Sequence, residues 1–134
     1  MKLSIAFAGA IALALLLAPE VSAFSQFSSP SGNIGCVMVR SGARCDVREH
    51  DWTAPPKPAW CDLDWGSGAS VGRRGRGSVV CAGDTALGGT RVLAYGDRER
   101  VGRFRCLSRR SGMRCVNHRN DHGFLISRQR LRLF

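Results

Sequence analysis

The stretch that decides the fold is Cys36-Val37-Met38-Val39-Arg40-Ser41-Gly42-Ala43-Arg44-Cys45, because its pattern returns as Cys106-Leu107-Ser108-Arg109-Arg110-Ser111-Gly112-Met113-Arg114-Cys115. Both stretches read Cys-x-x-x-Arg-Ser-Gly-x-Arg-Cys. A Ser-Gly turn between two short arms of alternating polarity predicts a β-hairpin with one cysteine on each arm. The sequence therefore predicts two hairpins, one near the start of the domain and one near its end, that staple a small all-β domain.

The chain contains six cysteines, and all of them follow residue 23. If residues 39–42 form a four-residue loop, Cys36 lies opposite Cys45, and the same spacing places Cys106 opposite Cys115. This opposition satisfies the short Cβ–Cβ distance of a disulfide and leaves Cys61 for Cys81. The spacing favours these pairs among the roughly 15 connectivities that are open to six cysteines. No Cys-x-x-Cys pair occurs, so a metal site is not expected.

Residues 1–23 have the organisation of a secretory signal peptide. Lys2 supplies a positive start, Leu3–Ala18 is apolar, and Val21-Ser22-Ala23 is a small-residue cleavage site. We expect a signal-peptide helix, cleavage after Ala23, and a single disulfide-rich β domain at 24–134 in the secreted fraction or the cell envelope or periplasm. Contact with a membrane is expected only through this segment, and only if it stays uncleaved as an anchor.

The mature part shows period-two alternation and no helical periodicity. Glycine-rich turns separate about seven or eight short apolar stretches, which predicts a small barrel or sandwich. Residues 24–31 read as a Ser-rich lead-in, 50–58 as a proline-rich connection and 66–77 as a glycine-rich loop. Gly102 reads as a bulge within one strand over 98–107. Strands are expected at 34–38, 43–48, 60–65, 78–82, 91–95, 113–117, 124–127 and, as an edge strand with its arginines toward water, 128–133.

The net charge of +10 favours an acidic partner. Lys2 and Lys57 are the only lysines, so 18 of the 20 basic residues are arginines. Two arginine-rich stretches are candidates for an anion-binding surface, with side chains from Arg98, Arg100, Arg103, Arg105, Arg128, Arg130 and Arg132. The partner expected is an anionic envelope polymer or another envelope protein. Nucleic acid is not expected, because an exported protein meets little RNA and Arg73–Gly77 lacks the aromatic residues that stack bases.

A non-enzymatic binding module is the favoured hypothesis, and two alternatives stay open. A small secreted hydrolase of the phosphodiesterase or RNase type would use a histidine for proton transfer and arginine for the phosphate. Its candidate residues are His118, His122 and Arg128, with His50 as a further histidine. The other alternative is a structural or regulatory protein partner. No phosphate loop or dinucleotide fingerprint occurs, so no cofactor is expected.

Several blocks of the mature chain also resemble a known family. They are Phe27, Ser29-Pro30-Ser31-Gly32-Asn33-Ile34-Gly35-Cys36, Cys81, Gly83-Asp84-Thr85, Leu93, Tyr95-Gly96, Cys106, Ser108, Gly112-Met113, Cys115, Asn117, His122-Gly123-Phe124 and Ser127-Arg128. They are similar to small exported bacterial proteins, of a type common in actinobacteria, that are described only as a domain of unknown function. The resemblance implies secretion and a compact cysteine-bonded domain, and it implies no activity. In that family a glycine commonly precedes His-Gly-Phe; Asp121 stands there in this chain, so we expect a different turn geometry.

Overall fold

The computed structural model describes residue 18 and residues 22–134, which form ten strands and no helix. The all-β class is confirmed. The strands make two open antiparallel sheets of five strands each, so the domain is a sandwich with more strands than the sequence predicted. They are β1 (Phe24–Ser28), β2 (Ile34–Val39), β3 (Gly42–Val47), β4 (Asp64–Gly72), β5 (Ser78–Ala82), β6 (Arg98–Val101), β7 (Phe104–Arg109), β8 (Gly112–Asn117), β9 (Gly123–Ile126) and β10 (Leu131–Leu133).

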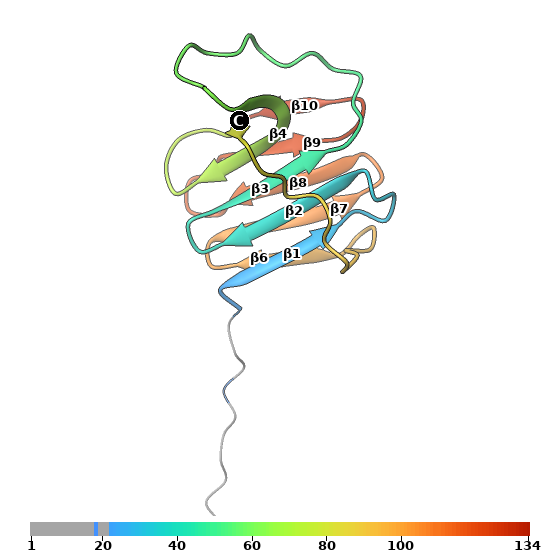
Figure 1. Cartoon of the computed structure of the whole chain (residues 1–134). Coiled ribbons are helices and arrows are strands. Elements are labelled where there is room, and N and C mark those ends of the chain that lie inside the picture. The colour runs from blue at the N-terminus through green and yellow to red at the C-terminus, as the bar shows by residue number, and fades with distance from the viewer. Residues whose placement is uncertain (1–17, 19–21) are drawn as a thin grey trace, which may run out of the picture.

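Each sheet is a meander in which every strand pairs with its neighbours in sequence. The first sheet has the order β1-β2-β3-β4-β5 and the second has the order β10-β9-β8-β7-β6. The sheets stack face to face, and β1, β3 and β4 contact β6, β8 and β9 of the other sheet (Figure 1). Antiparallel neighbours need only short connections, which suits a chain rich in turn residues. The second half of the domain therefore repeats the architecture of the first.

The two repeated stretches form the hairpins β2–β3 and β7–β8, which occupy equivalent places in the two sheets. Val39 pairs with Gly42 and Arg109 pairs with Gly112, so each hairpin closes through an Arg-Ser turn. This register places the two cysteines of each hairpin directly opposite each other. Three disulfides are present, and they join the pairs that the spacing favours: Cys36–Cys45, Cys61–Cys81 and Cys106–Cys115.

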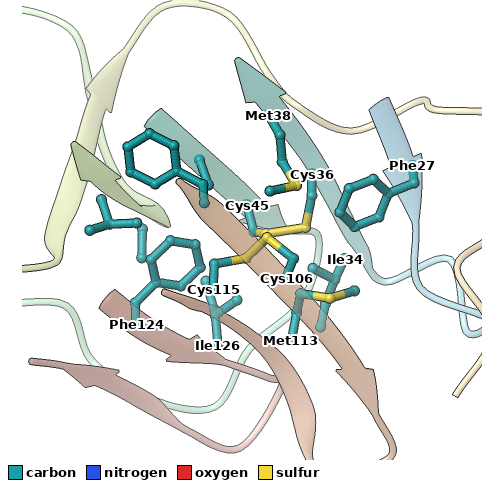
Figure 2. Packing of buried hydrophobic residues seen from close by; sticks show 14 of the residues in the cluster. Phe27, Ile34, Cys36, Met38, Cys45, Cys106, Met113, Cys115, Phe124 and Ile126 are labelled. Carbon is teal, nitrogen blue, oxygen red and sulfur yellow. A yellow bond between two sulfur atoms is a disulfide. The ribbon is translucent and has the colours of Figure 1, made fainter. Parts of the chain in front are cut away.

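The two hairpin disulfides meet at the centre of the sandwich. The Sγ atoms of Cys45 and Cys115 lie 3.6 Å apart, so the bridge of one sheet contacts the bridge of the other (Figure 2). Three fully buried phenylalanines, Phe27, Phe104 and Phe124, belong to the same core. Full burial of one such ring stabilises a fold by about 2–3 kcal/mol. Because side chains alternate along a strand, the aromatic and aliphatic residues that share the parity of the cysteines also point into this interior.

The connection between β5 and β6, residues 83–97, crosses the outer face of the first sheet, and we refer to it as the strap (Figure 1, yellow trace). Asp46 anchors it, because its carboxylate accepts hydrogen bonds from Thr85 Oγ1 and from the amide of Ala86 at 3.2 and 2.8 Å. The strap lies so close to the sheet that a Cβ on Gly35 would come within 2.6 Å of the Ala86 carbonyl oxygen. The expected strand over 91–95 is wrong: the strap forms a single parallel bridge there, between Val92 and Ser28.

Five other local expectations are corrected. The lead-in is strand β1. Only residues 64–65 of the strand expected over 60–65 are extended, because the Cys61 amide donates to the Pro58 carbonyl in a turn. Much of the expected loop over 66–77 belongs to β4, because β3 packs so close to Gly68 that a Cβ there would collide with Asp46 and the Cys45 carbonyl. Gly102 has a φ of 57° in the turn of a β6–β7 hairpin and is not a bulge. Only Leu131–Leu133 of the expected edge strand is extended, although it does form the edge of its sheet.

The predicted signal-peptide helix lies outside the described residues, and β1 begins at Phe24, directly after the predicted cleavage site. The part of the chain that the structure describes contains no helix with the length and apolar character needed to cross a bilayer. The three disulfides indicate an oxidising environment, as in the extracellular space or the cell envelope.

Candidate functional site

The outer surface of the second sheet is built from arginines. Directly paired residues of antiparallel strands project on the same side. Arg98, Leu107, Arg114, Leu125 and Arg132 are linked pairwise across all five strands and form one row. The same side carries the neighbouring pair Arg100 and Arg105 and, next to the β7–β8 turn, Arg109. We call these six residues the arginine face: Arg98, Arg100, Arg105, Arg109, Arg114 and Arg132.

No carboxylate from the strands of this sheet balances the arginine face. Glu99 is the one acidic residue in β6–β10, and it pairs with Cys106, which places it on the inner side. Its carboxylate binds Arg91 of the strap at 2.8 Å. Among the described residues, no arginine of the face takes part in a salt bridge. Arg100 stands directly opposite Arg105, and like charges in that relation destabilise a sheet. The face therefore carries a concentrated positive charge without a carboxylate partner among the described residues. Its contacts within the fold are uncharged ones: Arg100 donates to the Gly102 carbonyl at 3.1 Å, and Arg114 lies over the Phe134 ring at 5.0 Å.

The outer surface of the first sheet is different. Arg44, the counterpart of Arg114 in the repeated pattern, donates two hydrogen bonds to Asp46 at 2.7 and 3.0 Å and a third to Asp84 at 2.8 Å. Burial acts to lower the pKa of Arg44, but these bonds and charges outweigh it, so the pKa lies above its ordinary value. Arg44 in turn lowers the pKa of Asp84. One sheet is thus covered and neutralised by the strap, whereas the outer side of the other keeps its arginines exposed or half-buried.

The structure brings four of the seven predicted anion-binding arginines together on the face: Arg98, Arg100, Arg105 and Arg132. Arg103 lies in the β6–β7 turn, where partial desolvation and the nearby Arg119 and Arg73 lower its pKa. Arg128 and Arg130 lie in the β9–β10 turn, and Arg128 binds Glu49 at 3.2 Å. Sequence reasoning missed Arg109 and Arg114. Both lie in the repeated stretch on the parity opposite to the buried cysteines, and that parity was the signal that identifies them.

The predicted catalytic residues do not form a site. His50 stacks on Trp52 with ring centroids 3.7 Å apart, and its Nδ1 lies 2.8 Å from the Trp52 carbonyl oxygen. His118 and His122 belong to the turn between β8 and β9, where the His122 carbonyl accepts a hydrogen bond from the Asn117 amide at 2.8 Å. None of these histidines lines any of the four hollows found over the described residues. His50 does come near Arg128, because its sequence neighbours Glu49 and Asp51 pair with the Arg128 guanidinium at 3.2 and 4.0 Å. His118 and His122 lie in a different turn from Arg128.

His118 does lie beside the arginine face. Partial desolvation lowers its pKa, and the positive charges of Arg105 and Arg100 lower it further. His118 is therefore mainly neutral at neutral pH. This electrostatic coupling makes the histidine a probe of the arginine face.

A comparison with protein families matches residues 7–134 to a family described as "Family of unknown function (DUF6636)". The chain belongs to this family. Comparisons with curated proteins and with solved structures each find no match. Membership of DUF6636 assigns no activity.

One group of potential metal ligands occurs among the described residues of this DUF6636 protein, and it consists of Cys36, Cys45 and Cys115. All three are disulfide-bonded and buried. Thiolates are the form in which cysteine binds metals, so these sulfurs are not available as ligands in the oxidised protein.

Proposed function

We propose that this protein is a non-enzymatic module of the secreted fraction or cell envelope that holds a linear anionic polymer on its arginine face. The observation that carries the proposal is a sheet surface with six arginines and no carboxylate from its own strands. Guanidinium groups match phosphate, sulfate and carboxylate groups through paired hydrogen bonds. Three of the six arginines, Arg109, Arg114 and Arg132, line one hollow of about 220 Å³ on this surface.

The spacing of the face supports a polymer rather than a single ion. Neighbouring strands lie about 4.8 Å apart, and alternate residues along one strand lie about 6.6 Å apart. The arginines of the row occupy β6, β8 and β10, so apolar Leu107 and Leu125 separate them. A chain with regularly repeated charges meets several guanidiniums at once, whereas an isolated ion meets one or two. The apolar residues between them offer contacts to the backbone of the polymer.

The setting of the proposal is export through residues 1–23 with cleavage after Ala23. Intracellular nucleic acid is then not the partner, and anionic envelope polymers are the most abundant acidic chains that the protein would meet. An acidic envelope protein is the other partner class. Capture on a protein-free polymer distinguishes the two, because a protein-specific site would not retain it.

The test is retention of the oxidised domain on immobilised linear polyphosphate at several salt concentrations. Wild-type protein should bind and should elute steeply as salt screens the contacts. The variant Arg98→Gln/Arg114→Gln/Arg132→Gln should lose affinity by about tenfold or more, since each replaced arginine removes a charge-assisted hydrogen bond. The matched control is Arg40→Gln/Arg73→Gln/Arg74→Gln, which removes the same charge from turns of the first sheet. Equal losses in both variants would show that net charge alone causes retention and would contradict the proposal.

A further inference from the structure

A second basic feature lies at one end of the sandwich, apart from the outer face of the sheet. A hollow with a volume of about 430 Å³ opens between the β1–β2 turn, the tip of the β7–β8 hairpin and the β9–β10 turn. Its size falls within the range of small-molecule sites. The first and second sheets both contribute walls, so the hollow exists only because the two meanders pack against each other.

The charge of the hollow is strongly positive. Four arginines line it, Arg48, Arg109, Arg110 and Arg128, against the single carboxylate of Glu49. Among the described residues, only Arg128 of these four has a salt-bridge partner. A concave surface with one sign of charge focuses the electrostatic field and attracts counter-ions. The lining therefore has an excess of three positive charges, which favours an anionic ligand.

The walls are fixed by hydrogen bonds of their own. Ser29 Oγ accepts from the Ile34 amide at 3.1 Å, and Asn33 exchanges two hydrogen bonds with the backbone of Glu49, each at 3.0 Å. On the other side, a Cβ on Gly112 would come within 2.5 Å of the Ile126 carbonyl oxygen, so glycine allows the hairpin tip to approach β9. A site that is already ordered loses less entropy on binding.

Tyr95 gives the hollow an aromatic wall. The guanidinium carbon of Arg110 lies 4.9 Å from the centre of the Tyr95 ring, in a cation–π contact. This contact holds Arg110 at the rim, where its remaining N–H groups stay available. Arginine, serine and an aromatic ring together are the side chains that receive a phosphate attached to a polar ring.

We infer that this hollow is a binding site for a phosphorylated sugar, with Arg48 and Arg110 on the phosphate and Tyr95 beside the ring. The sugar phosphate comes either from a free molecule or from the end of an anionic polymer. Arg109 belongs to both the hollow and the arginine face, so a polymer on the face can place its terminal unit in the hollow. The inference itself does not depend on the proposed function.

Titration of the oxidised domain with glucose 6-phosphate tests the site, with binding followed by amide chemical shifts and calorimetry. We expect saturable shifts at Ser31, Gly32, Gly112 and Ser127, and no such shifts with glucose. Arg48→Gln/Arg110→Gln should weaken binding by about tenfold or more. The matched control is Arg40→Gln/Arg74→Gln, in which Arg40 holds the place of Arg110 in the other repeated hairpin. It should change affinity by less than about twofold, within the ordinary effect of surface substitutions.

Linear polyphosphate distinguishes the two sources of the ligand. The variant Arg48→Gln/Arg110→Gln is tested against both ligands. If it loses affinity for glucose 6-phosphate and keeps its affinity for polyphosphate, the hollow binds free sugar phosphates. If it loses affinity for both, the hollow binds chain ends. Absence of saturable shifts at millimolar glucose 6-phosphate, or equal weakening in the control, would overturn the inference. Neither result decides the arginine-face test, because its test variant replaces Arg98, Arg114 and Arg132.

Discussion

At the scale of single residues, His118 reports on the arginine face. Desolvation and the charges of Arg105 and Arg100 lower its pKa below the ordinary 6.5. A polyanion on the face offsets those positive charges, so saturation with polyphosphate should raise the pKa of His118. Titration of its ring carbon protons by NMR, with and without polyphosphate, measures this. An unchanged pKa at saturation would place the bound polymer somewhere else.

The same lowered pKa sets the sign of a pH effect on stability. Between the lowered folded-state pKa and 6.5, the unfolded chain binds more protons at His118 than the folded protein does. The free energy of unfolding should therefore rise with pH across this window. His118→Gln should flatten that rise in urea melts recorded at closely spaced pH values. A slope that is unaffected by the substitution would assign the pH effect to other groups.

Asp121 is the one described residue other than glycine with a positive φ, at 60°. The left-handed region costs most L-residues about 1–2 kcal/mol, less for aspartate, and costs glycine almost nothing. Asp121→Gly should therefore raise the free energy of unfolding by about 0.5–1 kcal/mol. Urea unfolding in high salt measures this, because salt screens the lost charge. Asp121→Ala serves as the opposite control and should destabilise the domain, since alanine keeps the Cβ and tolerates the left-handed region less well than aspartate does.

Arg109 and Arg114 show how far the sequence predicts the arginine face. The cysteine parity of each repeated stretch predicts the buried side of its strands, and the arginines on the other side give no local sign that they join one surface. Because β8 pairs with both β7 and β9, Arg114 lies in the middle of the row of side chains that crosses the sheet. Sequence periodicity predicts which side of its own strand a residue occupies. The row of arginines depends in addition on the pairing register of all five strands.

At the scale of elements, the strap depends on one buried carboxylate. Asp46 accepts from Arg44, Thr85 and the Ala86 amide, and it is largely inaccessible to solvent. Asp46→Ala leaves the buried amide without a partner and should lower the free energy of unfolding by about 2–3 kcal/mol. Urea denaturation measures the loss. Asp84→Ala is the matched control: its carboxylate is exposed, so the unfolding midpoint should stay almost unchanged. Similar losses in both would assign the effect to Arg44 rather than to the anchor.

The strap also explains why local patterns failed around it. Glycines in 66–77 predicted a loop, yet β4 runs through Gly66, Gly68 and Gly72. Tertiary contacts override the low strand preference of glycine, because a side chain at Gly68 would collide with Asp46. The expected strand over 91–95 has alternating apolar residues, but it meets only the end of the edge strand β1, through one bridge. Nothing local in the sequence indicates that a connection returns across a sheet.

At the scale of the whole molecule, the all-β class and the hairpin staples were predictable, because both follow from period-two alternation and cysteine spacing. The stacking of the sheets was not predictable, and it decides the functional surfaces. Stacking brings Ser31, Arg110 and Arg128 around one hollow although they lie far apart in sequence, while the strap covers one outer face and leaves the other to arginines. Local periodicity carries no information about such long-range placement.

Stacking also couples the two hairpin disulfides. Removal of Cys36–Cys45 or of Cys106–Cys115 by alanine pairs should each cost about 2–3 kcal/mol of unfolding free energy. Because Cys45 and Cys115 touch at 3.6 Å, the first removal already takes away contacts that the second would lose. The combined variant should therefore be less destabilised than the sum, by at least about 0.5 kcal/mol.

Urea unfolding of the wild type, the two single-bridge variants and the combined variant measures that coupling. If the combined variant is already unfolded in buffer, a stabilising osmolyte shifts all four proteins into the measurable range. The control cycle pairs Cys36–Cys45 with Cys61–Cys81, which joins residues 20 apart outside the central cluster. That cycle should be additive. An additive result in the first cycle as well would mean that each staple stabilises its own hairpin alone, and that the sheets associate through the phenylalanine core without help from the sulfur contact.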